Sequence, residues 1–441
     1  MPITTRPQTP LRARGAPPGH QRRSQIPSVP GADRRELDLL SEVRGPLGPI
    51  LWRLLSDTVL WSAADPSVRG ELFSNFSPRS WNLSGPLAGP AELEGALRIL
   101  AELPVYPATD SAAVASACAM VAAWLEVHGR KGAALQFAEA GARAHPNDPL
   151  RCYVAGRLCR RAGECERAKR WLARAIRLAR RANDDIAFAH AHRGYGFVLA
   201  DMGQFEKAEP HFWKCVRAAK RKGRRSLAGS GYHDLFMVAV HLERWDDALE
   251  YSQKAVALYK VGHPRFPLLA HDIAFFWCRR GFYSSGLPVF EKILPFVERQ
   301  RERILVLASL ARSAAVVRDN IRFQRAASAV LALAESDAEM SASSLYHLAE
   351  GARCFHDWDR AEELARQALA TARRRGNGTV VHLAEQLLNG LHSRQPGDID
   401  TVPAEGSVVD ATRELLLKKL VRQPLADDGK FPLLPEQYPT E

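Results

Sequence analysis

The stretch GQFEKAEPHFWKCVRAA (Gly203 to Ala219) has the spacing of one amphipathic helix, and the chain contains several variants of it. One variant, GRKGAALQFAEAGARAHP, begins at Gly129, and another, GECERAKRWLARAIRLA, begins at Gly163. Further copies begin at Glu243, Gly281 and His356. Self-similarity of this kind is the signature of a repeat protein, in which one supersecondary unit stacks on its neighbours.

Each copy carries a small residue at an equivalent position, and the spacing of these residues defines the repeat. They are Ala134, Ala168, Ala208, Ala248, Gly286, Ala326 and Ala361, separated by 34, 40, 40, 38, 40 and 35 positions. A second core position follows four residues later and a third follows three after that, so all three lie on one helical stripe. Small residues on this stripe allow another helix to approach closely.

Another helix precedes each copy and carries an apolar residue followed by a small one. Val121–Ala122, Ala155–Gly156 and Tyr195–Gly196 show this pairing. Each unit is therefore predicted to be two antiparallel helices joined by a short turn. The pattern weakens twice, because Phe236 stands where a small residue is expected and the sixth unit, near RDNIRFQRAASAVLAL, is degenerate.

These units resemble the tetratricopeptide repeat family. In that family the first helix carries an aromatic, a Leu-Gly pair and a Tyr, and the second carries Ala, an aromatic, Ala and then Pro. The segment from Gly129 to Pro146 matches best, with Ala134, Phe137 and Gly141. The resemblance spans roughly residues 115 to 394. It implies an all-α fold, a right-handed superhelical solenoid of antiparallel helix pairs.

The sequence divides into four predicted regions. Residues 1–35 are rich in Pro and Arg and are expected to form a disordered basic arm, although a transit peptide has a similar composition. Residues 36–114 are helical and turn-rich, and form either a cap on the first repeat or a separate partner-docking module. Residues 115–394 hold seven units and a capping helix. Residues 395–441 hold a linker, the short helix DATRELLLKKLVR and an extended tail.

Composition favours a cytoplasmic protein. The seven cysteines are odd in number and fall mostly on apolar stripes, which is typical of reduced, buried thiols rather than of a disulfide framework. No segment reaches the ~18 to 20 apolar residues that a membrane helix needs. We therefore expect no association with a membrane.

No catalytic or cofactor motif is found. The sequence contains no phosphate-binding Walker loop, no nucleophile elbow, no HExxH zinc motif and no dinucleotide fingerprint. We therefore expect a protein that is not an enzyme and that has no cofactor and no metal.

A polar stripe recurs on the first helices of neighbouring units. His233–Asp234 and His271–Asp272 occupy equivalent positions, and Arg193 takes the place of the histidine one unit earlier. Neighbouring residues on a helix point about 100° apart, so we do not expect His and Asp there to act as a general base and its orienting group. His233 and His271 could instead approach each other and hold a metal, but no third ligand is evident. A hydrogen-bonded polar stripe is the favoured interpretation.

The resemblance places one side of the first helices on the wall of a concave groove. Aromatic and Met side chains there supply apolar contact, and arginines bind carboxylates through paired hydrogen bonds. We therefore expect an extended protein segment, with acidic character, as the ligand. The Lys/Asn pattern of family members that bind chaperone tails is absent. The wall residues that the resemblance implies are Tyr153, Arg157, Arg160, Arg193, Phe197, His233, Met237, His271, Phe275, Tyr346 and Arg353.

Charge leaves a second functional class open. Lys plus Arg exceeds Asp plus Glu by 61 − 49 = 12, with clusters such as KRKGRR at residues 220–225. Basic clusters can bind phosphate backbones. The leading prediction is a scaffold or adaptor for protein segments, and the alternative is a regulatory protein that also binds nucleic acid. The tail FPLLPEQYPTE, residues 431–441, could occupy the groove in cis and compete with a partner.

Overall fold

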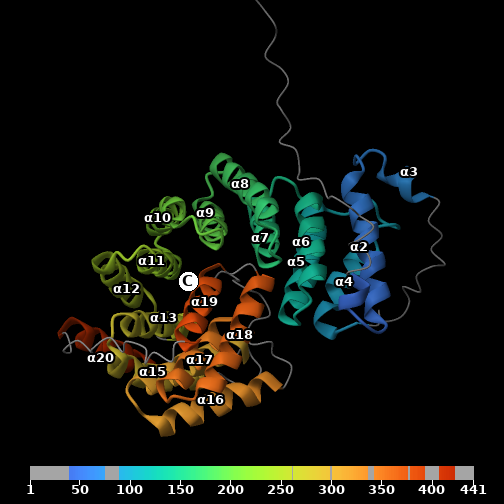
Figure 1. Ribbon diagram of the computed structural model, residues 1–441. Helices are drawn as coiled ribbons and strands as arrows, with labels where there is room; N and C mark the ends of the chain where they lie inside the picture. Colours follow the sequence, from blue (N-terminus) through green and yellow to red (C-terminus); the bar gives the residue numbers. More distant parts are fainter. Residues whose placement is uncertain are drawn as a thin grey trace, which may run out of the picture.

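The computed structural model describes residues 39–74, 89–260, 262–297, 300–335, 342–375, 378–392 and 407–422. Within these ranges the chain forms helices and no strands (Figure 1). The predicted basic arm (1–35), the first part of the linker and the extended tail (431–441) lie outside the described residues. The predicted all-α superhelical repeat fold is confirmed.

Seven consecutive helix pairs form the array. Each first helix packs along its second helix, and most second helices pack along the next first helix. The pairs are α5 (Ser111–Val127) with α6 (Lys131–Ala144), α7 (Pro149–Arg161) with α8 (Cys165–Arg181), α9 (Asp185–Asp201) with α10 (Phe205–Arg221), α11 (Arg225–His241) with α12 (Trp245–Leu258), α13 (Phe266–Arg279) with α14 (Tyr283–Ile293), α15 (Gln300–Val316) with α16 (Asn320–Glu335), and α17 (Ala342–Cys354) with α18 (Trp358–Arg375).

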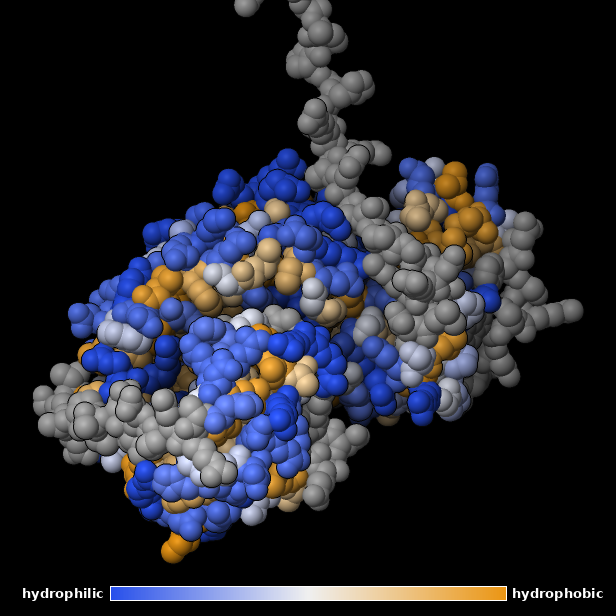
Figure 2. Space-filling view, viewed as in Figure 1, coloured by the Kyte–Doolittle hydropathy of each residue, from blue (hydrophilic) through white to orange (hydrophobic). Residues whose placement is uncertain are grey.

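The array is curved. In Figure 1 α7 to α12 form an arc, with the first helices α7, α9 and α11 on its inner side and the second helices α8, α10 and α12 on its outer side. The following pairs bend back toward the inner side, so that α19 (Gly378–His392) faces the arc. Figure 2 shows the surface hollowed between the arc and the α18–α19 end of the array.

The turn inside every pair uses the same backbone conformation. One residue of each turn has a positive φ, at Gly129, Gly163, Gly203 and Gly281 and also at Glu243, Arg318 and His356. Glycine adopts this left-handed conformation without steric cost, whereas an L side chain clashes there. The turn residue thus marks the same point in each unit, independently of the surrounding sequence.

Small residues make the helix pairs close. A Cβ on Gly156 of α7 would lie 2.6 Å from Cγ of Leu172 on α8, and a Cβ on Gly196 of α9 would lie 2.7 Å from the ring of Phe212 on α10. The second helices are equally tight, because Ala134, Ala168 and Ala208 are fully buried. These positions were predicted from the repeat spacing, and the packing confirms them.

The predicted register of the sixth unit is wrong by three residues. In the other units the small position lies five residues after the positive-φ turn residue, as Ala208 follows Gly203. Five residues after Arg318 is Phe323, not Ala326. Phe323 is fully buried and packs against Gly351 of α17, where a Cβ would lie 2.5 Å from its ring. A glycine on the next unit therefore makes the space that the sixth unit itself does not provide.

The fourth unit exchanges large and small residues. Phe236 stands at the position of Gly156 and Gly196, and Ser252 stands at the position of Leu172 and Phe212. Phe236 and Ser252 are both buried. The reversed order keeps the combined volume of the pair, which is what a close-packed interior tolerates.

Two N-terminal helices pack on the first pair, α2 (Leu47–Ala63) on α6 and α4 (Glu94–Ala101) on α5. Helix α3 (Arg69–Ser74) lies between them in the sequence, and a short 3₁₀ turn precedes α4. The carboxylate of Glu42 accepts hydrogen bonds from the backbone N–H groups of Gly132 and Ala133, at 3.0 and 2.9 Å. It thus caps α6, whose own first residues provide no side-chain cap. Trp61 of α2 is buried and donates to the carbonyl of Pro107 at 2.8 Å.

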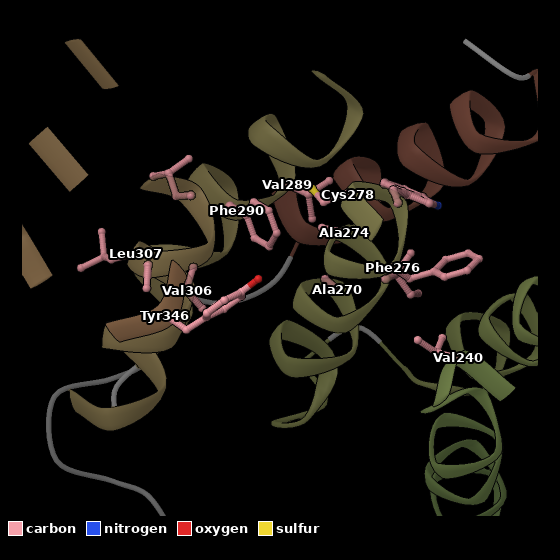
Figure 3. Close-up of a cluster of buried hydrophobic side chains, with 14 of the residues drawn as sticks. Val240, Ala270, Ala274, Phe276, Cys278, Val289, Phe290, Val306, Leu307 and Tyr346 are labelled. Atoms are coloured by element: carbon pink, nitrogen blue, oxygen red, sulfur yellow. The ribbon is translucent and has the colours of Figure 1, made fainter. Parts of the chain in front are cut away.

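In the part of the chain that the structure describes, two helices follow the seven pairs. Helix α19 packs on α18 and α17, and α20 (Ser407–Val421) returns to the middle of the array, where it packs along α14 and touches α13. Figure 3 shows the apolar core of this middle part, in which Phe290 of α14 lies between α13 and the side chains of Val306 and Leu307. No helix of the described ranges has the length and apolar character required to cross a bilayer.

Candidate functional site

A ladder of polar contacts joins consecutive first helices. Nε and Nη2 of Arg193 on α9 both donate to the carboxylate of Asp234 on α11, with Nη2 3.2 Å from Oδ1. Nε2 of His233 on α11 lies 2.8 Å from Oδ2 of Asp272 on α13. Nε2 of His271 on α13 lies 3.1 Å from Oγ of Ser309 on α15. We refer to these six residues as the inter-unit ladder.

The ladder follows the repeat. Arg193, His233 and His271 occupy one position of successive units, and Asp234, Asp272 and Ser309 occupy the next position along the helix. Tyr153 of the second unit and Gly194 of the third occupy the same two positions. A Cβ on Gly194 would lie 3.3 Å from the tyrosine ring. The interpretation of this stripe as a hydrogen-bonded polar stripe is confirmed.

Asp272 accepts from two histidines, one of them its own neighbour. Contrary to expectation, Nδ1 of His271 lies 2.9 Å from Oδ1 of Asp272, although adjacent residues on a helix diverge. Burial alone raises the pKa of Asp272, but the hydrogen bonds from His233 and His271 outweigh burial and hold the pKa well below its ordinary value. A carboxylate charge is therefore retained between the two rings.

The order Asp272–His271–Ser309 resembles the hydrogen-bond relay of a serine hydrolase. Ser309 is only 3% exposed, however, and it lies within α15, whose backbone N–H groups are used by the helix. A nucleophile needs access to substrate and nearby donors for an oxyanion. This relay has neither, so its evident role is to position α13 against α15.

Arginine and aromatic side chains meet between α7 and α9. The guanidinium carbons of Arg160 and Arg193 each lie 5.0 Å from the ring centre of Phe197. Arg160 also pairs with Asp201 at 2.8 Å, and the two side chains are 23% and 43% exposed. Arg157 makes two hydrogen bonds to Glu126 of α5, at 2.9 and 2.8 Å. We call Arg160, Phe197 and Asp201 the inner cluster.

Side chains of the fifth and seventh units meet across the curve. The ring of Phe275 on α13 lies 5.6 Å from that of His347 on α17. Burial, followed by the charge of Arg312, holds the pKa of His347 well below its usual range. Glu350 of α17 pairs with Arg312 at 2.6 Å and with Arg353 at 3.2 Å. Side chains of α13, α15 and α17 therefore contact one another at this end of the array.

Four features define the fold: seven helix pairs, a shared turn geometry, small residues between paired helices, and contacts that link successive first helices. The array is tetratricopeptide-repeat-like. No protein-family model matches the sequence, and no curated protein matches it.

Several solved structures resemble this TPR-like array. A chain of the APC/C hetero-tetramer Cut9–Hcn1 is 15% identical with a TM-score of 0.46, and the match covers 67% of this chain and 52% of that one. This chain thus spans about half the length of that chain. A tetratricopeptide repeat protein from Parabacteroides merdae is 14% identical with a TM-score of 0.43, covering 63% and 98%. The apo form of RapI is 10% identical with a TM-score of 0.42, covering 64% and 98%. At this identity the likeness concerns the fold alone.

The predicted groove residues of the TPR-like array fall into two sets. Tyr153, Arg193, His233, His271 and Tyr346 are buried. The half-buried set is Arg157, Arg160, Phe197, Met237, Phe275 and Arg353. Whether a ligand contacts either set stays a prediction. The sequence did not reveal the acidic partners, although the spacing of 41 residues from Arg193 to Asp234 and of 39 from His233 to Asp272 is close to the repeat period.

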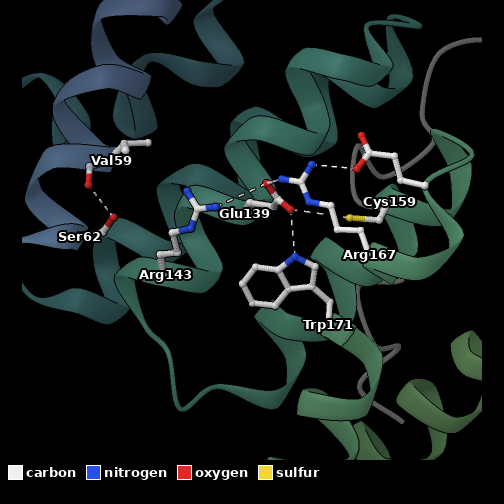
Figure 4. Close-up of polar contacts among 8 residues, drawn as sticks. Val59, Ser62, Glu139, Arg143, Cys159, Arg167 and Trp171 are labelled. Carbon is white, nitrogen blue, oxygen red and sulfur yellow. Dashed lines mark hydrogen bonds and ion pairs between the residues drawn. The ribbon is translucent and has the colours of Figure 1, made fainter. Parts of the chain in front are cut away.

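A second buried network was also missed. Glu139 of α6 is 2% exposed, accepts from Nε1 of Trp171 at 2.9 Å and pairs closely with Arg167, so it ties α6 to α8 of the next unit (Figure 4). Cys159 lies 3.7 Å from the same carboxylate, and burial raises the pKa of its thiol. The network stabilises the junction of the first two units.

The described ranges do not support a metal site or a nucleic-acid-binding cluster. The described ranges contain no group of three or more His, Cys, Asp or Glu side chains placed to hold a metal. The seven cysteines lie in the described ranges and form no disulfide, and five of them are buried. In the cluster at residues 220–225, Arg221 and Lys222 both pair with Asp185. The alternative of a nucleic-acid-binding regulator is therefore not supported.

Proposed function

We propose that this chain is a non-enzymatic scaffold or adaptor that binds an extended protein segment of acidic character in the hollow beside α7, α9 and α11. The observation that carries this proposal is the inner cluster, in which Arg160 stacks on Phe197 and pairs with the exposed carboxylate of Asp201. This cluster combines an accessible cation with an apolar ring, which together suit an acidic residue beside an aromatic or aliphatic one.

The ion pairs Arg160–Asp201 and Arg193–Asp234 differ in exposure. This difference indicates which arginine can bind a ligand and which one has a structural role. An exposed ion pair contributes only about 0 to 1 kcal/mol, so a ligand carboxylate can replace Asp201 beside Arg160 at little cost. The Arg193–Asp234 pair is 5% and 4% exposed, and separating it would leave charges in a poorly solvated interior. Arg193 therefore orients Phe197, and Arg160 supplies the exchangeable charge.

The position of the inner cluster also favours the N-terminal part of the hollow. Phe275 and His347 contact each other near the other end, so a ligand there would have to displace the protein's own side chains. The net positive charge of the chain, 61 − 49 = 12, attracts acidic segments at long range. The tail at residues 431–441 stays a predicted competitor in cis, and removal of residues 424–441 should then raise partner affinity.

A selection from a display library of random peptides tests the proposal. The wild-type full chain should enrich extended sequences with acidic residues next to apolar ones. The variant Arg160→Ala/Phe197→Ala should bind the selected peptides at least about tenfold more weakly, a loss of about 1.4 kcal/mol, since it removes both the cation and the ring that contact the ligand.

Arg177→Ala is the matched control, because Arg177 is exposed on α8, a helix of the outer side. This control should bind like the wild type. Equal binding by Arg160→Ala/Phe197→Ala and the wild type would exclude the inner cluster as the ligand site. Enrichment without any preference for acidic residues would exclude the proposed ligand chemistry.

A further inference from the structure

The last described helix, α20, is not part of any helix pair of the repeat. It packs along α14 and touches α13, although fourteen residues of sequence, 393–406, separate it from the last helix of the array. Figure 1 shows α20 at the outer edge of the molecule, beside α12 and α13 and distant from α7. Its site is therefore separate from the inner cluster.

The contact of α20 is one-sided. Thr412, Leu416 and Leu420 are buried, with exposures of 4%, 0% and 0%, and they recur every four residues along one face. Leu415 and Val421 of the same helix are 44% and 67% exposed. This is the anchor pattern by which an amphipathic helix binds in a groove.

Polar contacts fix the register of α20. Nζ of Lys419 donates to the carbonyl oxygens of Val256 and Tyr259, at 2.5 and 3.2 Å. These carbonyls belong to the end of α12, where helix carbonyls lack partners within the helix and the helix dipole is negative. Nη1 of Arg413 donates to Oγ of the buried Ser285 on α14, at 3.3 Å.

The stacking of units leaves room for this helix. Four second helices, α6, α8, α10 and α14, pack along the next first helix, but α12 meets α13 over only a short stretch. The connection from α12 to α13 spans residues 259–265, whereas residues 222–224 suffice between α10 and α11. Helix α20 lies beside α13, α14 and the end of α12, a place we call the seam.

We propose that the seam is a binding site for an amphipathic helix and that α20 is its displaceable occupant in cis. The partner is a helix with two leucines four residues apart and a lysine immediately before the second leucine, as Leu416, Lys419 and Leu420 are arranged. A helix of fifteen residues is marginal alone in water, so α20 holds its structure through the seam and leaves when its anchors are replaced. A partner helix must overcome the high effective concentration that the tether gives α20.

A labelled synthetic peptide of residues 405–423 tests this on the full chain. It should bind Leu416→Ala/Leu420→Ala at least about tenfold more tightly than the wild type, because the competitor in cis is weakened. The control Leu415→Ala/Val421→Ala changes two exposed positions of the same helix and should bind like the wild type. A peptide carrying Lys419→Ala should lose most of its affinity for the first variant.

Either of two results would overturn the proposal. One is equal affinity of the peptide for the wild type and for Leu416→Ala/Leu420→Ala, and the other is no binding of the peptide to that variant. If that variant does not fold, hydrogen exchange of the wild-type chain replaces it: excess peptide should speed exchange of the α20 amides of the protein and leave those of α8 unchanged. Unchanged exchange in α20 would equally overturn the proposal.

Discussion

The buried pair of Arg193 and Asp234 allows a direct test of the inter-unit ladder. Asp234→Ala removes the carboxylate that balances a guanidinium only 5% exposed. Removing one partner of a buried ion pair costs about 3–5 kcal/mol. If the array unfolds as one unit of about 250 residues, 1 kcal/mol corresponds to about 2–4 °C, so the melting temperature should fall by about 10 °C. Calorimetry and urea titration of the full chain measure both quantities.

Two matched variants complete the test. Asp201→Ala removes the partner of Arg160 between α7 and α9, but this carboxylate is 43% exposed and the expected loss is below about 1 kcal/mol. Arg193→Met/Asp234→Leu replaces both charges with apolar groups, and should recover much of the loss caused by Asp234→Ala. Equal costs for Asp234→Ala and Asp201→Ala would refute the argument that burial makes this rung of the ladder structural.

Further predictions concern the turns, the sixth unit and pH. Glu243→Gly should raise the free energy of unfolding by up to about 1 kcal/mol in urea titrations, because φ is 57° there. Gly351→Ala should destabilise by about 1–3 kcal/mol through its clash with Phe323, and Gly351→Ala/Phe323→Leu should recover part of this. Burial lowers the pKa of His192 to about 3 and of His211 to about 4, so the unfolded chain binds protons that the folded chain does not. Stability should therefore fall as pH decreases from about 6.5 toward 4, and His211→Gln should flatten this slope in thermal melts.

The repeat could be predicted because its determinants are local. A turn residue, a small residue five positions later and an apolar residue four after that lie within one turn and the helix that follows it, so their period is visible in the sequence. The register of the sixth unit was predicted wrongly because Ala326 is small, whereas Phe323 occupies the position of the small residue. Only the turn conformation at Arg318 distinguishes the two alignments, and a non-glycine residue gives no sequence signal for a positive φ.

The candidate site was only partly predictable for a related reason. The polar stripe was visible because its members share a position in the repeat, but its contacts join residues one unit apart and depend on how the units stack. Adjacent His271 and Asp272 were expected to diverge, yet Asp272 accepts from both His271 and His233. The docking of α20 is further from any local rule, since Lys419 and Tyr259 are 160 residues apart and no period connects them.

The junction between the fourth and fifth units includes both a contact of the inter-unit ladder and a contact of α20. Packing of α12 on α13 is short, and directional contacts take its place: His233 with Asp272 between the first helices, Phe236 edge-on to Phe276 at 5.6 Å, and Lys419 of α20 at the end of α12. Where two helices pack along each other over only a short stretch, local opening costs less free energy than in the core around it. Amides at the end of α12 and the start of α13 should therefore exchange faster than those at the α8–α9 junction, where the helices pack at length. Uniform protection across both junctions would show that the polar contacts and α20 fully compensate for the short packing of α12 on α13.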